Sequence, residues 1–222
     1  MLLPRLYAIL DTACFLDKND LLTTAEKLVA GGCTLLQYRN KSGNAREMLE
    51  QARELKRYLG VQESQNPPVA QNATRAGHSQ TVRLIMNDRA DLCLAAEFDG
   101  VHVGQDDLSP ESVRKIIGPE RWLGVSTHNP EQLQEADLTS ADYLAIGPVF
   151  STSSKDRPDP VVGLEGVRRA RQLTRRPLVA IGGITRGNAA SVIEAGADSV
   201  AVISDLLREP RKSAEEFFRI LR

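Results

Sequence analysis

Short apolar runs alternate along the chain with longer stretches whose apolar residues recur at helical spacing. The first apolar run is Leu6–Leu10, and the first amphipathic stretch is Leu21–Ala30, which Gly31 and Gly32 end. Short, continuously apolar runs are typical of strands buried on both faces, and glycine commonly ends a helix. The pattern therefore predicts a strand followed by a helix.

This alternation continues to the last residues. The expected strands are Leu6–Leu10, Thr34–Gln37, Leu84–Met86, Gly100–Val103, Trp122–Val125, Asp142–Ile146, Leu178–Ile181 and Ser199–Ile203. The expected helices are Leu21–Ala30, Ala45–Tyr58, Ala90–Ala96, Pro110–Ile117, Pro130–Ala136, Leu164–Leu173, Asn188–Ala195 and Ala214–Leu221. Strict alternation to about eight units favours an α/β fold closed as a (β/α)8 TIM barrel over an open doubly wound sheet. We expect residues 1–222 to form this single domain.

One segment departs from the pattern. Residues 60–81 are polar, contain Pro67 and Pro68, and show neither helical nor strand periodicity. Structureless loops of this length are uncommon inside compact domains. We expect a flexible insertion on the helix-to-strand side of the fold, away from the chemistry.

Composition narrows the classes of partner. The 222 residues carry 28 Lys and Arg against 29 Asp and Glu, a formal net charge of −1, which argues against a nucleic-acid or membrane-surface partner. The apolar N-terminal segment is too short for a membrane span, and Pro4, Arg5 and Asp11 interrupt it. Three cysteines without metal-ligand spacing favour a reducing cytoplasm. Small molecules are the expected partners, and a homo-oligomer is compatible with the sequence.

Polar residues follow most of the expected strands. In chain order they are Gln37, Arg39, Lys41, Asn87, Asp88, Gln105, Asp106, Asp107, Ser126, Thr152, Ser154, Lys155 and Ser204. Gly182 and Gly183 follow the seventh strand, and Ile203 precedes Ser204 at the end of the eighth. Parallel strands end on the same face of a barrel, and ligands bind at that face. We expect these side chains to share one cavity.

The carboxylates in this set suggest a metal site. Asp88 and Asp107 follow neighbouring strands, and Mg²⁺ commonly takes one or two carboxylates while water and phosphate fill its other positions. Two other interpretations remain open. Asp88 would also suit the N-cap of the helix that follows it, and Asp106 and Asp107 cannot both face one ion, so one of them is expected at the surface.

Three cations beside these carboxylates suit a diphosphate with its Mg²⁺, because Arg39, Lys41 and Lys155 would neutralise its charge. Gly183 and Ser204 follow the last two strands, where barrels often hold a phosphate on backbone N–H groups. Single cations at strand ends are more often solvated, however, and tight turns use glycine anyway. His102 is expected to be a packing residue.

Six ordered motifs carry a family resemblance. They are Gln37–Lys41, Asn87–Arg89, Gly100–Asp107, Gly147–Phe150 with Lys155, Ala180–Ile184 and Val200–Ser204. Over nearly the whole length the chain resembles thiamine phosphate synthase. The resemblance implies a (β/α)8 barrel that joins 4-amino-2-methyl-5-(diphosphooxymethyl)pyrimidine to 4-methyl-5-(2-phosphooxyethyl)thiazole and releases pyrophosphate.

The resemblance also implies roles for individual residues. The pyrimidine diphosphate site would comprise Gln37, Tyr38, Arg39, Asn40, Lys41, Asn87, Ser126 and Lys155, and the thiazole phosphate site Thr152, Ser153, Ser154, Gly183, Ile203 and Ser204. Asp88 and Asp107 would bind Mg²⁺. Arg39, Lys41, Ser126 and Lys155 would be catalytic.

Two alternatives to a synthase are a thiazole tautomerase-like relative and a non-catalytic phosphate-binding barrel that regulates thiamine synthesis. The tautomerase-like relative lacks the complete diphosphate set, which this sequence keeps. A phosphosugar isomerase would need a catalytic acid–base pair, and the sequence offers no convincing one.

Overall fold

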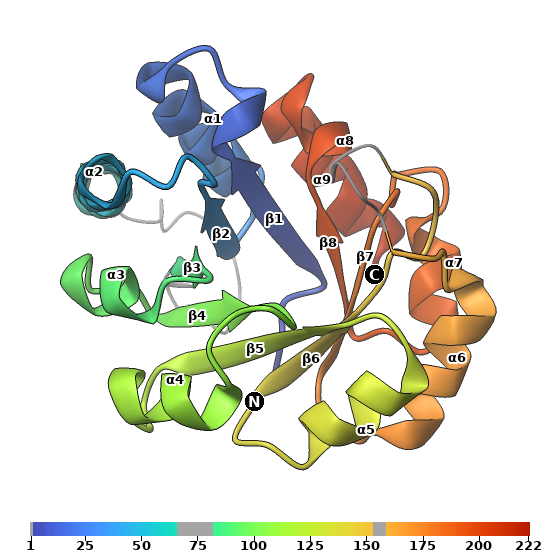
Figure 1. The fold of residues 1–222 in the computed structure, drawn as a ribbon. Coiled ribbons are helices and arrows are strands. Elements are labelled where there is room, and N and C mark those ends of the chain that lie inside the picture. The colour runs from blue at the N-terminus through green and yellow to red at the C-terminus, as the bar shows by residue number, and fades with distance from the viewer. Residues whose placement is uncertain (1, 66–81, 153–158) are drawn as a thin grey trace, which may run out of the picture.

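The protein is an eight-stranded parallel barrel surrounded by helices (Figure 1). The computed structural model describes residues 2–65, 82–152 and 159–222. Each strand pairs with the next one along the chain, and β8 returns to pair with β1 in the register Leu6 opposite Val200. The expected closed barrel is thus confirmed.

All eight expected strands are present, and most of them differ from the expectation by only one or two residues at an end. They are β1 (Leu6–Asp11), β2 (Leu35–Arg39), β3 (Arg83–Asn87), β4 (Gly100–Val103), β5 (Trp122–Thr127), β6 (Tyr143–Ile146), β7 (Leu178–Ile181) and β8 (Ser199–Val202). Several strands include the polar residues that sequence reasoning placed just after them.

The expected helices are also present. They are α1 (Lys18–Ala30), α2 (Ala45–Gln65), α3 (Ala90–Ala95), α4 (Pro110–Ile117), α5 (Pro130–Asp137), α6 (Gly163–Leu173), α7 (Ala189–Glu194) and α9 (Pro210–Ile220). The structure adds a 3₁₀ turn, η1 (Thr12–Cys14), and a short helix, α8 (Ser204–Leu207).

Local chemistry explains why some of these helices begin and end where they do. The Asp17 carboxylate accepts the backbone N–H groups of Asn19 and Asp20 at the start of α1. At α4, Ser109 accepts the N–H of Ser112, Pro110 occupies the first turn, and Gly118 ends the helix. Side chains that accept the free N–H groups of a first turn stabilise a helix by about 1 kcal/mol.

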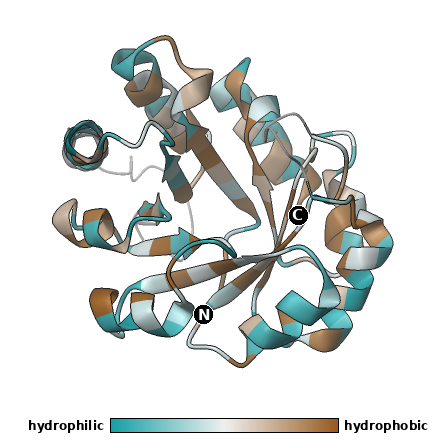
Figure 2. Cartoon of the chain, viewed as in Figure 1, coloured by the Kyte–Doolittle hydropathy of each residue, from teal (hydrophilic) through white to brown (hydrophobic). Residues whose placement is uncertain are grey.

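The core has two layers. One set of buried side chains fills the barrel interior: Leu3, Tyr7, Ile9, Leu35, Ile85, Tyr143, Ala145, Val179 and Ala201. A larger set packs between the strands and the surrounding helices. Figure 2 shows the corresponding pattern, with hydrophobic colour on the strands and both colours on the helices. Successive residues of a strand point to opposite layers, so strand parity decides which side chains reach the interior.

The helix α2 continues to Gln65, past the expected end at Tyr58 and into the segment expected to be an insertion. The remainder of that segment, residues 66–81, lies outside the described residues. In the described ranges, we find no helix with the length and hydrophobicity that crossing a membrane would need.

Candidate active site

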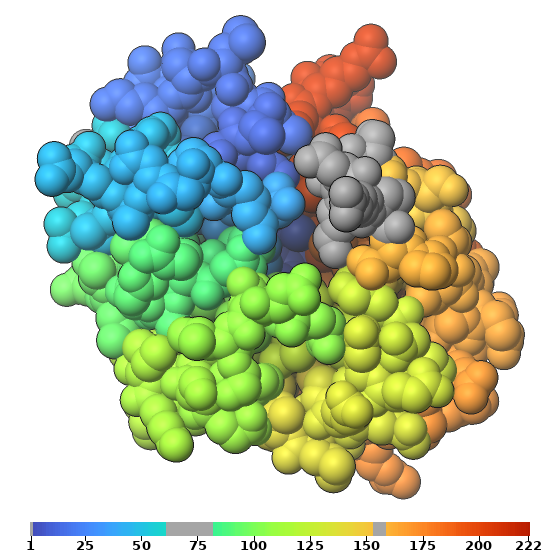
Figure 3. All heavy atoms as spheres, viewed as in Figure 1, coloured from blue at the N-terminus to red at the C-terminus, as the bar shows by residue number. Residues whose placement is uncertain are grey.

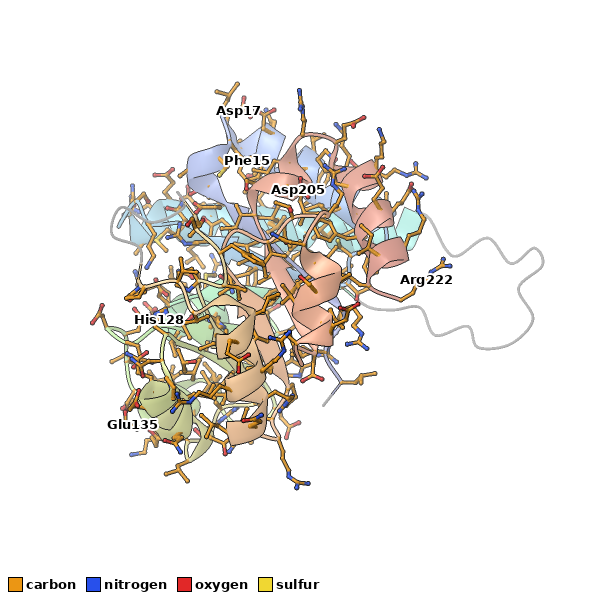
Figure 4. The ribbon with its side chains drawn as sticks, turned by 90° about the vertical axis from the view of Figure 1, so that its right-hand side faces the viewer. Phe15, Asp17, His128, Glu135, Asp205 and Arg222 are labelled. Carbon is orange, nitrogen blue, oxygen red and sulfur yellow. The ribbon has the colours of Figure 1, made fainter. Side chains whose placement is uncertain are left out.

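A cavity of about 180 Å³ opens at the carboxyl ends of the strands. Its lining residues come from the strands and the loops after them. Those discussed below are Tyr7, Gln37, Arg39, Asn87, His102, Ser126, His128, Gly183 and Ser204. Figure 3 shows this face of the molecule, where atoms from distant parts of the chain meet. In Figure 4, His128 at the carboxyl end of β5 and Arg222 after α9 lie toward opposite sides of the molecule.

Most of the residues expected in the two substrate sites line this cavity. They are Gln37, Arg39, Asn87, Ser126, Thr152, Gly183, Ile203 and Ser204. Ser153, Ser154 and Lys155, expected in the loop after β6, lie outside the described residues. Five other described residues of the expected set, Lys41, Asp88, Gln105, Asp106 and Asp107, are not among the lining residues. The expectation that all these strand-end side chains share one cavity is therefore met only in part.

Tyr38 and Asn40, both expected in the pyrimidine diphosphate site, have side chains directed away from the cavity. Tyr38 is fully buried in the layer between strands and helices, where its hydroxyl donates to Gln51 Oε1 over 2.7 Å. It faces outward because its neighbours on β2, Gln37 and Arg39, face the cavity. The buried Asn40 amide donates to Tyr38 and Gln51 and accepts the Ser42 N–H. The Tyr38 and Asn40 side chains thus shape the loop after β2 and do not line the cavity.

Arg39 does line the cavity, and its guanidinium is paired with the carboxylate of Asp11. Asp11 ends β1 opposite Arg39 in the sheet register and is 4% exposed. A buried carboxylate that is paired with a guanidinium holds the planar guanidinium group in one orientation. Sequence reasoning did not include Asp11 in the site.

Asp88 has an unusual backbone. Its φ is +63°, in the left-handed region that aspartate tolerates better than most residues. Its N–H donates to the carbonyl of His102 over 2.8 Å, and its carboxylate is paired with Lys41. Helix α3 begins after Arg89 and has no side-chain cap. The helix-capping interpretation of Asp88 is therefore excluded.

Asp107 lies beside Asp88 at the neighbouring strand end. Its carboxylate accepts the N–H of Gly104 over 2.7 Å. Burial raises the pKa of Asp107, and the nearby Asp88 carboxylate raises it further, while the Gly104 N–H and the Lys41 ammonium lower it. Asp106, next to it, is exposed. Only one of the two adjacent aspartates thus approaches Asp88, and it is Asp107.

This carboxylate pair fits Mg²⁺. Among the described residues, no group of three or more His, Cys, Asp and Glu side chains is arranged to hold a metal. Two carboxylates suffice for Mg²⁺, which keeps water and phosphate oxygens as its remaining ligands. The repulsion that raises the pKa of Asp107 would be relieved by a cation between the two groups.

Asn87 carries an unsatisfied donor. Its side chain is 8% exposed and lines the cavity, and its Nδ2 has no hydrogen-bond partner. Buried amide groups are nearly always paired, so an unpaired one in a cavity favours a ligand acceptor such as a phosphate oxygen.

The loops after β7 and β8 meet at one edge of the cavity. Gly182 and Gly183 have φ values of +101° and +62°, and a Cβ at Gly183 would lie 2.5 Å from the carbonyl oxygen of Ser151. The glycines are thus needed for loop packing whether or not an anion binds. Ser204 begins the short helix α8.

A hydrogen-bonded series of side chains crosses the barrel interior beneath these loops. We call it the interior network. It runs from Gln37 to Tyr7 (2.8 Å), Tyr143 (3.0 Å), His102 (3.1 Å) and Ser126 (2.8 Å). Burial lowers the pKa of His102 to about 4, although the Asp107 carboxylate opposes the change. His102 is therefore neutral at pH 7.

Sequence reasoning missed the role of this network. His102 was expected to be a packing residue, and Tyr7 and Tyr143 were read only as strand residues. A usable signal was present, since residues 100, 102, 124 and 126 share the parity that points inward in β4 and β5. His128, which the sequence analysis did not include in the site, also lines the cavity, with its Nδ1 2.6 Å from the Gly147 carbonyl oxygen.

Acidic and basic side chains that meet at the carboxyl ends of these strands place the protein among the (β/α)8 barrels suited to a phosphorylated ligand. The class can be narrowed by comparison with known proteins. A family model described as thiamine monophosphate synthase matches residues 6–206, and the chain belongs to this family. The resemblance carried by the sequence motifs is confirmed.

Individual proteins that are similar to this chain support the same family assignment. A thiamine-phosphate synthase from Koribacter versatilis is 60% identical over 222 residues, covering 99% of this chain and 96% of its own length. One from Chloroflexus aurantiacus is 41% identical over 200 residues, which are 90% of this chain and 83% of its own. The solved structure of a thiamine phosphate pyrophosphorylase from Pyrococcus furiosus has a TM-score of 0.79 at 31% identity, covering 98% of this chain and 95% of that one.

Proposed function

We propose that this protein is a transferase that makes thiamine phosphate. It condenses the aminopyrimidine methyl diphosphate with the thiazole phosphate and releases pyrophosphate. Family membership supports the reaction. The observation that supports this reaction in this chain is the pairing of Asp88 with Lys41 beside Asp107. Asp88 directly follows Asn87, which lines the cavity together with Arg39.

In the first half of the reaction, the bond between the pyrimidine methylene carbon and the diphosphate oxygen breaks, and the electron pair leaves with pyrophosphate. The electron-rich aminopyrimidine stabilises the remaining cation. Mg²⁺, held by Asp88 and Asp107, would supply positive charge to the diphosphate. Arg39 and Lys41, with Lys155 by the family resemblance, stabilise the charge that grows on the leaving group.

In the second half, the thiazole nitrogen attacks the methylene carbon with its own lone pair. This nitrogen carries no proton, so the step needs no general base. The neutral His102, hydrogen-bonded through both ring nitrogens, fits that requirement. Thr152, Ser153, Ser154, Gly183, Ile203 and Ser204 are proposed to bind the thiazole phosphate, and Gln37, Asn87 and Ser126 the pyrimidine diphosphate.

The whole chain, residues 1–222, is proposed to act as one domain in the cytoplasm. All three cysteines are free, with Cys33 and Cys93 buried. Thiols without disulfide partners are suited to a reducing compartment.

The reaction is tested by incubating the protein with both substrates and Mg²⁺ and measuring thiamine phosphate and pyrophosphate. Equimolar formation of both products is expected. Protein that binds both substrates yet releases no pyrophosphate would favour the non-catalytic phosphate-binding barrel.

Asn87→Leu provides a site-specific test. Leucine has a similar shape and removes the unsatisfied donor, so the melting temperature should stay the same or rise. The KM for the pyrimidine diphosphate should rise by about 10- to 100-fold, because a lost hydrogen bond to a charged group weakens binding by roughly 1.5–3 kcal/mol.

A further inference from the structure

The interior network passes β5 at a glycine, Gly124, which has no side chain. In the sheet register, His102 of β4 lies opposite Gly124 of β5, and Gly124 lies opposite Tyr143 of β6. A Cβ at Gly124 would lie 2.1 Å from Tyr143 Cζ and 2.4 Å from His102 Nδ1. The glycine thus leaves the space in which the tyrosine hydroxyl and the imidazole meet.

Each member of the interior network has a limited number of hydrogens to donate. Tyr7 and Tyr143 have one hydroxyl hydrogen each, and a neutral imidazole has one N–H and one bare nitrogen. Every internal contact therefore has one donor and one acceptor. Tyr7 and Tyr143 are buried, so a hydroxyl that accepted from both neighbours would leave its own hydrogen without an acceptor; a hydroxyl that accepts from one side therefore donates to the other. The hydrogens of the whole series must run in the same direction.

Two directions satisfy the interior network. In one, the Gln37 amide nitrogen donates to Tyr7, the hydrogens run toward Ser126, and His102 carries its proton on Nε2. In the other, Gln37 is turned so that its oxygen accepts, and His102 carries its proton on Nδ1. The first direction leaves Gln37 Oε1 as an acceptor and the Ser126 hydroxyl as a donor. The second exchanges these roles.

The structure has the first direction, with Gln37 Nε2 placed 2.8 Å from the Tyr7 hydroxyl. Ser126 Oγ then accepts from His102 Nε2, and its own hydrogen has no other acceptor within the ranges that the structure describes. Gln37 and Ser126 both line the cavity. The interior network therefore ends in one acceptor and one donor that face the ligand.

We propose that Tyr7, Tyr143 and His102 are positioning residues that fix Gln37 Oε1 as an acceptor and the Ser126 hydroxyl as a donor toward the substrate ring. The proposal rests on the proposed function for the identity of the ring. An aminopyrimidine offers the complementary pair, an amino N–H and a bare ring nitrogen. Its 4-oxo counterpart offers the reverse, a carbonyl oxygen and a ring N–H. The interior network thus makes the cavity select the amino form.

The direction can be measured without any substrate. In protein labelled with ¹⁵N in its histidines, NMR distinguishes a protonated from a bare ring nitrogen, and the His102 signal is identified by its loss in a His102→Gln variant. We expect Nε2 protonated and Nδ1 bare. The reverse tautomer, a mixture of the two, or an imidazolium at pH 7 would each overturn the proposal. Because no turnover is involved, this result is independent of whether the protein is a synthase.

The selectivity is tested by breaking the interior network at Tyr143→Phe, which removes one hydroxyl oxygen from a residue that does not line the cavity. The hydrogen-bond directions at Gln37 and at Ser126 are then no longer coupled, and the Ser126 hydroxyl can either donate or accept. The ratio of the Kd values for the amino and 4-oxo pyrimidine diphosphates, measured by calorimetry, should fall by about tenfold. The matched control, Tyr58→Phe, removes a hydroxyl that donates to Glu26 between α2 and α1, and should leave the ratio unchanged.

A purely structural role for Tyr143 predicts another result. The melting temperature of Tyr143→Phe would fall while the amino-to-oxo ratio stayed at the wild-type value, and that outcome would refute the proposal. If Tyr143→Phe does not fold, Tyr7→Phe interrupts the same series one position earlier and should reduce the ratio in the same way. An unchanged ratio in folded Tyr7→Phe protein would likewise refute it.

Discussion

Asp88 combines three properties that bear on metal binding. Its backbone is left-handed, its carboxylate is paired with Lys41, and it lies close enough to Asp107 to raise that residue's pKa. A left-handed backbone costs an ordinary residue about 1–2 kcal/mol. The conformation turns the carboxylate toward the neighbouring strand end, where a cation would bind both aspartates.

The two adjacent aspartates after β4 should behave differently. Asp107→Asn removes one of the paired carboxylates, so the Mg²⁺ concentration for half-maximal rate should rise at least about tenfold. Asp106→Asn is the matched control, because Asp106 is exposed and only one position away. Measuring the rate against Mg²⁺ concentration for both variants checks this, and similar shifts in the two would contradict the assignment.

The polar residues at strand ends were predictable one by one, because their position after an apolar run is visible in the sequence. The direction of each side chain was less predictable. Tyr38 and Asn40 stand within the same motif as Arg39 and Lys41, yet their side chains are buried beside α2. Motif membership does not separate the residues that line a cavity from those that shape the loop behind it.

At the scale of elements, an ion pair joins the loops after β7 and β8. The Arg186 guanidinium donates to both carboxylate oxygens of Asp205, at 3.0 and 3.1 Å, and is also paired with Glu216 of α9. The Arg186 N–H donates to Asp205 as well, over 2.8 Å. Asp205 follows Ser204, so this ion pair holds α8 against the loop that contains Gly183.

Arg186→Ala should therefore loosen the site proposed for the thiazole phosphate. We expect the KM for the thiazole phosphate to rise by about tenfold, while the KM for the pyrimidine diphosphate changes by less than about twofold. Arg211→Ala provides the control, since it breaks an exposed ion pair within α9. Steady-state kinetics with each substrate varied in turn make the comparison. Equal increases in both KM values would show a general loss of structure instead.

Elements were the most predictable level, because apolar runs and glycine or proline at their ends are local signals. The structure differs from the expected elements where contacts between distant residues determine the end of a strand or the position of a turn. β5 continues to Thr127, two residues beyond its apolar run, since Ser126 and Thr127 pair with β6. The turn η1 is stabilised by Asp11, whose carboxylate accepts the N–H of Ala13. Neither feature has a periodic pattern in the sequence.

For the whole molecule, the neutral His102 in the barrel interior links stability to pH. Burial lowers its pKa to about 4, compared with about 6.5 in an unfolded chain. Between these values the unfolded chain binds the extra proton, so the stability that depends on neutral His102 is complete above about pH 6.5 and is lost as the pH falls toward 4.

Lowering the pH from 7 to 4.5 should thus reduce the free energy of unfolding by roughly 2–3 kcal/mol through this residue. A His102→Gln variant should lose less stability over the same interval, whatever its stability at pH 7. Denaturant unfolding at each pH, without Mg²⁺, measures both. Equal losses in the variant and the wild type would assign the pH dependence to other groups.

Closure of the barrel has a consequence for how the protein is made. The free edge of β1 is covered only when β8, residues 199–202, pairs with it. During synthesis from the N-terminus, most of the chain must leave the ribosome before that edge finds its partner. Until then the growing sheet has two open edges, which can pair with other chains. The last strand therefore ends the period in which the nascent protein is most prone to aggregate.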